Sequence, residues 1–221
     1  MSIFSHKLRS SGKPSRGRAS RQAGFTLIEL LAVTAIITII TLTLLLRQSA
    51  FDSTVVLRNV TYSVALSVRQ AQVYGVSVLG SSNAGDVQFA PGYGLYFNQN
   101  TPASYILFAD FNNNSTYDVA TETVKVFSLR PGYTISGICV QRSNGTNRCS
   151  NQEDGTGSAT IDWATIMFKR PNPDASFKND AFPNETYISG WVQVQSAAGT
   201  ARSVLITASG QINVQAPGTL P

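Results

Sequence analysis

A single carboxylate stands in the longest apolar stretch of this sequence, and it is the first group that can do chemistry. Residues 25–46 carry no charged side chain except Glu29, the fifth residue of the run. An isolated carboxylate in an apolar medium costs several kcal/mol unless a cation or hydrogen-bond donors meet it. Glu29 therefore predicts a cationic partner from outside its own helix. The alternative is a side chain that reaches out to the edge of the apolar region.

Oxygen-bearing side chains recur between residues 110 and 122. They are Asp110, Asn112, Asn114, Asp118 and Glu122. Calcium takes six to eight oxygen ligands from flexible loops, so these five residues are candidate ligands of a calcium ion, the one cofactor that the sequence suggests. The EF-hand pattern is imperfect, because Ser115 replaces the glycine of the sharp turn and Thr121 the final acid. The alternative is a loop whose side chains hydrogen-bond their own backbone.

The two cysteines, Cys139 and Cys149, flank a turn-rich stretch. If this part of the chain is exported, we expect a disulfide that closes the loop, with free thiols as the alternative. The spacing does not match a redox CxxC pair or a zinc ligand set. The bridge is therefore expected to stabilise a loop and to do no chemistry.

Catalysis has little support in the sequence. The only histidine, His6, precedes the apolar run, so the rest of the chain cannot build a histidine-based triad, general base or zinc site. Paired-carboxylate chemistry is conceivable, but the acids are scattered through loop segments. We expect no enzyme; an enzyme anchored by a single membrane span is the alternative.

The elements that position these groups begin with a basic leader and a membrane span. Six cations and no acid precede Gly24, which leaves 11 of the 17 basic residues against 12 acids in the rest of the chain. This basicity predicts a leader retained in the cytoplasm. The 22 residues of the run reach roughly 33 Å as a helix, enough to cross a bilayer core. A cleaved secretory signal is the competing interpretation, but its apolar region is shorter.

A second helical segment, residues 47–75, follows the span. Its large apolar residues recur at helical spacing and predict the seam that packs on the following domain. They are Phe51, Val55, Tyr62, Leu66, Val73 and Val76. We expect one helix from about residue 25 to residue 74, ending at Gly75.

The remainder, residues 76–221, alternates with a period near two and is punctuated by turn residues. It predicts strands at residues 76–79, 94–98, 105–108, 123–129, 134–141, 160–168, 187–195, 202–207 and 211–215. Ser209 and Gly210 mark a tight hairpin turn between the last two. The expected fold is α+β: a long N-terminal helix, whose first half is transmembrane, packed on an antiparallel β-sheet head.

The segment GFTLIEL at residues 24–30, after its basic leader, resembles the signature of type IV prepilins and type II secretion pseudopilins. The resemblance implies removal of residues 1–24 by a prepilin peptidase that cuts after Gly24, and N-methylation of Phe25. It also implies that Glu29 meets the amine of a neighbouring Phe25 when residues 25–46 assemble with other pilins or pseudopilins.

The head resembles that of H-type (GspH/FimT-like) proteins, on RQAQVYGVSV at residues 69–78 and RSVLITASGQI at residues 202–212. The resemblance implies a minor pseudopilin of a type II secretion system, held by one span in the inner membrane with the head exported. The alternative is a FimT-like minor pilin of a type IV pilus, with roles in priming, adhesion or DNA uptake. The tail after Arg202 has no cation, which disfavours DNA binding there, but Arg142, Arg148, Lys169 and Arg170 can still meet in space.

Overall fold

The computed structural model describes residues 24–77, 80–83, 86–119, 121–150 and 160–216. The chain divides into two compact units, residues 1–46 and residues 47–221, which we describe separately. The expected leader, up to residue 23, lies outside the described residues, as do residues 78–79 of the first expected strand.

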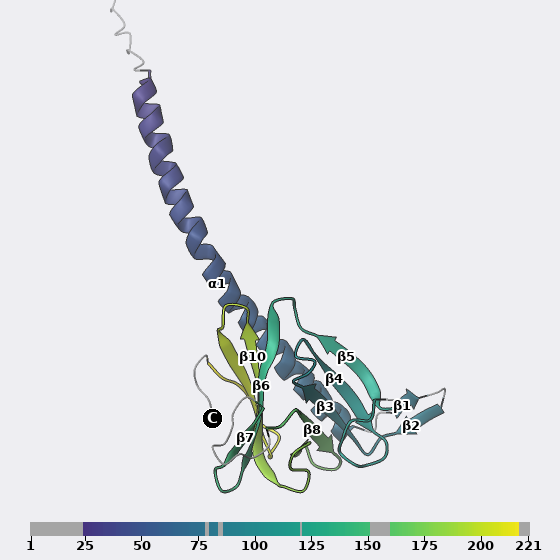
Figure 1. The fold of residues 1–221 in the computed structure, drawn as a ribbon. Helices are drawn as coiled ribbons and strands as arrows, with labels where there is room; N and C mark the ends of the chain where they lie inside the picture. The colour runs from purple at the N-terminus through teal and green to yellow at the C-terminus, as the bar shows by residue number, and fades with distance from the viewer. Residues whose placement is uncertain (1–23, 78–79, 84–85, 120, 151–159, 217–221) are drawn as a thin grey trace, which may run out of the picture. The chain divides into compact units, whose positions relative to one another are not determined.

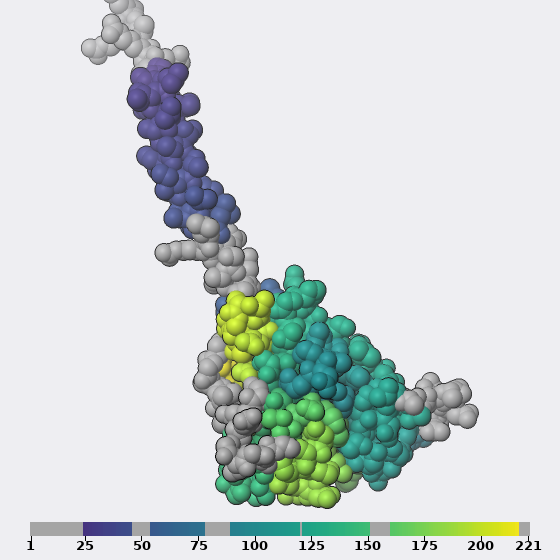
Figure 2. All heavy atoms as spheres, in the orientation of Figure 1, coloured from purple at the N-terminus to yellow at the C-terminus, as the bar shows by residue number. Residues whose placement is uncertain are grey.

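The first unit is the apolar part of helix α1, which spans Leu27–Val76. Within it, Leu27–Leu45 forms a 19-residue stretch long and apolar enough to cross a membrane, and none of it is buried. Figure 2 draws the atoms of this segment in purple. A helix whose entire circumference is apolar and exposed needs lipid or other helices around it.

The rest of α1 packs into the second unit, on a face that differs from the predicted one. The predicted seam is wrong: Val55, Tyr62, Leu66, Val73 and Val76 are exposed, and the side chain of Phe51 is outside the description. The buried face comprises Leu57, Val60, Val64, Val68 and Ala71. Both sets recur at helical spacing, so this half of α1 has two apolar faces, and the one with the smaller side chains faces the core.

The helix ends one residue later than expected, and its glycine has another role. Gly75 lies inside the last turn, where an added Cβ would stand 2.3 Å from the carbonyl oxygen of Phe168. Glycine is therefore needed for a close approach between α1 and a strand. The expected strand at residues 76–79 is wrong at its start, because Val76 is still helical.

The head is built of antiparallel strands in two five-stranded sheets and a separate hairpin (Figure 1). The strands are β1 (Gly80–Asn83), β2 (Asp86–Phe89), β3 (Gly92–Asn98), β4 (Ser104–Asp110), β5 (Thr123–Ser128), β6 (Tyr133–Arg142), β7 (Asn147–Cys149), β8 (Trp163–Lys169), β9 (Ala175–Asn179), β10 (Tyr187–Ser196), β11 (Ala201–Thr207) and β12 (Ile212–Val214). The first sheet has the order β5-β4-β3-β8-β9, the second β12-β11-β10-β6-β7, and β1 pairs with β2. The predicted α+β fold with an antiparallel head is confirmed.

One hydrophobic core joins α1 to both sheets. Leu95 and Phe97 of β3 and Leu107 of β4 come from the first sheet, and Val192 and Val194 of β10 come from the second. The period-two alternation of these strands places every second side chain in this core. The chain passes from the first sheet to the second after β5, returns for β8 and β9, and then completes the second with β10–β12.

Loops and short strands account for the remaining differences from the sequence. The expected hairpin turn is present: Gly210 has φ of 80° between β11 and β12, and its N–H donates to the carbonyl of Thr207 at 2.9 Å. The strands β1, β2, β7 and β9 were not predicted. Each has three to five residues, too few for alternation to be recognised.

Candidate functional site

The residues of the predicted processing site lie at the start of α1. Gly24, Phe25 and Thr26 precede the first helical residue, and Phe25 is 80% exposed. Thr26 is the N-cap: its Oγ1 accepts the Glu29 N–H at 3.2 Å, and its carbonyl accepts the Leu30 N–H at 3.1 Å. This is half of a capping box, in which a threonine and a glutamate three residues later define a helix start. The peptide bond after Gly24 is thus in an exposed, non-helical segment that a peptidase can reach.

Glu29 lies in the first turn of α1, where the helix dipole favours a negative charge. Its side chain is exposed, and its carboxylate accepts no hydrogen bond from any described residue. The local structure therefore supplies a favourable field but no partner. A cation brought by another molecule can reach this carboxylate without displacing an existing contact.

Threonine hydroxyls in the apolar segment are satisfied by the helix itself. Thr34, Thr38, Thr41 and Thr43 each donate to a carbonyl three or four residues earlier, at 2.7–3.0 Å. Such bonds let a hydroxyl sit on a helix in a medium that offers no other acceptor. Among residues 27–45, Glu29 is then the side chain that needs a partner from outside the segment.

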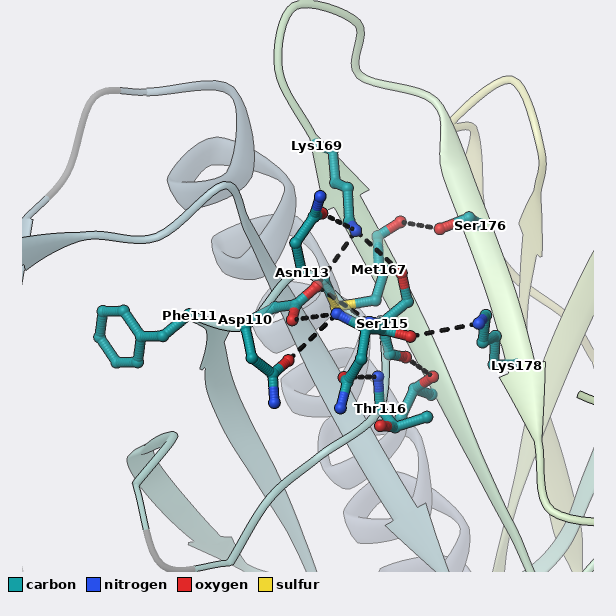
Figure 3. A network of polar contacts seen from close by, with 12 residues as sticks. Asp110, Phe111, Asn113, Ser115, Thr116, Met167, Lys169, Ser176 and Lys178 are labelled. Atoms are coloured by element: carbon teal, nitrogen blue, oxygen red, sulfur yellow. Dashed lines mark hydrogen bonds and ion pairs between the residues drawn. The ribbon is translucent and has the colours of Figure 1, made fainter.

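The second candidate site is the loop between β4 and β5, residues 111–122, which begins at a buried carboxylate. Asp110 is fully buried; its Oδ1 accepts the Asn114 N–H and its Oδ2 the Ser115 N–H, both at 3.0 Å. The ammonium of Lys169 stands 3.1 Å from Oδ2 (Figure 3). Asp110 therefore holds the turn of the loop and already has a cation beside it.

Glu122 closes the other end of the loop and is 1% exposed. Its Oε1 accepts the Phe111 N–H and its Oε2 the Asp118 N–H, each at 3.0 Å. Burial raises the pKa of the Glu122 carboxyl, and the nearby charge of Asp110 adds to the rise, while the backbone donors oppose it.

The other three predicted ligands also meet within this loop. The side-chain amides of Asn112 and Asn114 donate to Oδ2 of Asp118 at 2.5 and 3.2 Å. The structure thus brings all five residues into one network, in which every carboxylate accepts hydrogen bonds from the loop. Within the described ranges, no three acidic, histidine or cysteine side chains are arranged to hold a metal ion. Calcium binding by the carboxylates and amides together stays a prediction.

Lysines of the first sheet hold the loop over its outer face, which the sequence did not suggest. Lys169 donates to Oδ1 of Asn113 at 2.7 Å and to Oγ of Ser115 at 2.8 Å, and Lys178 donates to the Asn114 carbonyl at 3.2 Å. Thr165 adds a bond to the Ser115 carbonyl at 2.8 Å. Asn113 and Ser115 have φ of 61° and 64°, so two non-glycine residues adopt the left-handed conformation here. These sheet contacts offset the cost of that backbone.

The cysteine pair lies in the second sheet. Cys139 of β6 is directly opposite Cys149 of β7, with Cα atoms 4.1 Å apart, and the two form a disulfide. Trp191 of β10 packs against the bridge and is 2% exposed. The disulfide joins two neighbouring strands and closes the loop between them.

Comparison with known proteins returns one match. A family described as the prokaryotic N-terminal methylation motif matches residues 19–45, the segment that contains Gly24, Phe25 and Glu29. No curated protein and no solved structure is significantly similar to the chain. The exposed junction before α1, the apolar helix and this match agree with one another: the amino-terminal segment of the chain is prepilin-like and carries the type IV methylation motif.

Proposed function

We propose that the protein is a structural filament subunit, and specifically a minor pseudopilin of a type II secretion system. The observation that carries the proposal is the methylation motif at the start of a helix that is apolar through Leu45 and then enters a β-rich head. A subunit of a pilus-like filament needs both parts, a helix that assembles and a head that folds on its own core. The prepilin-like character supports the filament role, and the choice of secretion machine rests on the H-type resemblance of the head.

Maturation has two proposed steps at the exposed junction. A prepilin peptidase hydrolyses the Gly24–Phe25 peptide bond, which frees the Phe25 amine. That amine then takes a methyl group from a sulfonium methyl donor and loses a proton, while the donor leaves as a thioether. The cationic amine of one subunit is placed beside the Glu29 carboxylate of its neighbour. In an apolar medium this pairing offsets the large cost of an isolated charge and fixes the axial position of one helix against the next.

Mass spectrometry of the processed protein tests the maturation steps. We expect Phe25 as the first residue, carrying one additional methyl group. A first residue downstream of Leu46 would show that the apolar segment is a discarded signal and would end the proposal.

A Glu29→Ala variant tests the assembly step. We expect normal insertion into the membrane and an unchanged melting temperature of the head, with loss of recovery in sheared filaments. Glu29→Asp keeps the charge and is the matched control. Normal incorporation of Glu29→Ala would refute the role of the carboxylate.

A minor pilin of a type IV pilus, including one that takes up DNA, is the alternative. DNA binding needs cations free to meet phosphates. Arg142 and Arg148 both pair with Glu185, at 3.4 and 3.9 Å, and Lys169 pairs with Asp110. Since these pairs lie on different sheets, the contacts favour a structural role. Retardation of DNA by the purified protein at low salt would favour the uptake function instead.

Calcium binding at the β4–β5 loop is a separate proposal. Asp110, Asn112, Asn114, Asp118 and Glu122 offer the oxygen chemistry that calcium prefers, and the ion would compete with the Lys169 ammonium at Asp110. A rise in melting temperature at millimolar calcium, reversed by a chelator and not produced by magnesium, would support it.

A further inference from the structure

The tip of the hairpin between β6 and β7 carries the one Asn-Gly pair of the sequence, Asn144 and Gly145 (Figure 1). Residues 143–146 are all exposed, while Gln141 and Asn147 on either side are half-buried and paired with each other. The tip therefore combines an accessible side-chain amide with a neighbouring backbone nitrogen that no Cβ shields. Two such groups can react with each other without an enzyme.

The turn holds the two reacting groups together. The Thr146 N–H donates to Oδ1 of Asn144 at 3.0 Å, so the side chain of Asn144 folds back over the backbone of the next residue. Gly145 has φ of 83°, and a Cβ added there would meet no atom of the described residues within 4 Å. The space around the Gly145 nitrogen is therefore open, and a ring can close there without displacing another part of the head.

We propose that Asn144 and Gly145 form a site of spontaneous deamidation. The Gly145 backbone nitrogen gives up its proton to water and attacks Cγ of Asn144. The new C–N bond closes a succinimide ring, and the side-chain nitrogen takes up a proton and leaves as ammonia. Water then adds to one of the two ring carbonyls and breaks its bond to nitrogen, which leaves an aspartate or an isoaspartate in the place of Asn144. The reaction needs no oxidant, and it goes beyond the filament role and does not depend on it.

Two hydrogen bonds of the turn act on this reaction in opposite directions. The Thr146 N–H polarises the side-chain carbonyl of Asn144 and stabilises the negative charge that develops on its oxygen during the attack. The Gly145 N–H donates to the carbonyl of Arg142 at 3.0 Å, and this bond must break first. It lies in the exposed turn, so it can open locally while β6 and β7 stay paired. The rate is then set by the opening of one turn, and unfolding of the head is not required.

The disulfide limits the structural effect of the reaction. An isoaspartate adds one atom to the backbone of the turn, which misaligns the hydrogen bond from the Arg142 N–H to the Thr146 carbonyl, 2.9 Å long before the reaction. Below the turn, Cys139 and Cys149 still join β6 to β7. We therefore expect the modified head to stay folded and its melting temperature to change by no more than a few degrees.

The product also places a new charge beside an ion pair. Arg142 and Arg148 pair with Glu185 at 3.4 and 3.9 Å. A carboxylate in the place of Asn144 is two residues from Arg142 and competes with Glu185 for it. Because Arg142 is partly exposed, this competition is weak. The gain of one negative charge is nevertheless enough to separate modified from unmodified protein by isoelectric focusing.

The β4–β5 loop provides an internal control. Asn114 is exposed, and its Oδ1 accepts the Thr116 N–H at 2.7 Å, as Oδ1 of Asn144 accepts the Thr146 N–H. The following Ser115, however, has a side chain, and its N–H is held at 3.0 Å by Oδ2 of the buried Asp110. A bond to a carboxylate is stronger than a bond to a carbonyl. We expect Asn144 to react at least about tenfold faster than Asn114.

Peptide mapping of the full-length chain tests the site. The protein is incubated in detergent micelles at neutral and at mildly alkaline pH, and trypsin then releases residues 143–148 free of the disulfide, since it cuts after Arg142 and Arg148. We expect this peptide to convert into two products in which an amide is replaced by an acid, with isoaspartate among them, and faster at alkaline pH. A sample digested at once gives the background. Asn144→Gln cannot close the same ring and should leave the peptide unchanged.

Three results would overturn the proposal. The first is an Asn144 that stays intact or reacts no faster than Asn114. The second is aspartate without isoaspartate, because direct hydrolysis of the side chain gives aspartate alone. The third is a glycan on Asn144 in protein isolated from the cells that make it, since Asn144-Gly145-Thr146 also matches the glycosylation acceptor sequence and a glycan would block the amide nitrogen.

Discussion

The apolar segment Leu27–Leu45 and the second unit satisfy their side chains in opposite ways. In the segment no residue is buried, and the hydroxyls of Thr34 through Thr43 return to their own helix. In the second unit, buried polar groups such as Gln72 and Asp110 bond across elements. The difference shows that the second unit supplies partners for these buried groups from its own elements, while the segment exposes its apolar side chains along its whole length. The second half of α1 has one apolar face buried in the core and another apolar face exposed to solvent.

The largest expected effect comes from placing the same charge on the two faces of α1. Val68→Asp puts a carboxylate into a fully buried position, which costs several kcal/mol, a large part of the stability of a typical domain. We expect the head to unfold or melt far below the wild type in circular dichroism. Leu66→Asp is the matched control and should leave the melting temperature within a few degrees. Equal losses would mean that the two faces are not distinct.

Removing the disulfide tests how far the head depends on a covalent link. Replacing both Cys139 and Cys149 by serine should lower the free energy of unfolding by about 3 kcal/mol, as expected for a loop of this length. Chemical denaturation measures the loss, and reduction of the wild type should reproduce it. The helical signal of the apolar segment in detergent should not change. A loss of that signal as well would show that the two regions do not fold independently.

The Lys169→Met variant tests whether the loop provides its own cation. We expect a loss of about 2 kcal/mol, because Asp110 stays buried without its ionic partner. Lys178→Met removes a bond to a carbonyl only and should cost less. If calcium binds at this loop, it should restore the stability of Lys169→Met more than it stabilises the wild type. No calcium effect on either protein would remove the calcium proposal.

The smallest expected effect is a pH dependence at Glu122. Its pKa is raised in the folded protein above the usual 4.5, so the folded state binds the proton more tightly than the unfolded state. This contribution to stability is complete below about pH 4.5 and is lost as the pH rises through the raised pKa. The unfolding free energy of the wild type minus that of Glu122→Gln should therefore fall as the pH rises through this range. A difference that rises with pH would show that the backbone donors outweigh burial.

The sequence predicts those features that depend on neighbouring residues. The apolar run and the lone Glu29 lie within a few residues of one another, and the family match covers the same segment. Strands of six or more residues were predicted because alternation is visible over that length. The strands β7 and β9 are defined by pairing with β6 and β8, which a local pattern does not contain.

The two faces of α1 show why the seam was assigned wrongly. Both faces repeat at helical spacing, and the larger side chains of Tyr62 and Leu66 suggest the stronger apolar surface. The head instead selects Leu57, Val64 and Val68, whose shape fits between the two sheets. Periodicity shows that an apolar face exists. Which of two apolar faces becomes buried depends on the shape of the rest of the core.

The β4–β5 loop was predicted in composition but not in its contacts. Its oxygen side chains were identified, while the cation beside Asp110 comes from Lys169, which is distant in sequence and adjacent only because β8 pairs with β3 beside β4. A long-range ion pair of this kind leaves no signal near either residue.

The alternating path of the chain between the two sheets has a consequence for biosynthesis. The first sheet lacks β8 and β9 until the ribosome has passed residue 179, and the second lacks three strands until residue 214 has been made. Such non-local pairings make a head slow to fold. The apolar segment is therefore complete, and free to meet a membrane or another helix, while the head is still an unfolded chain.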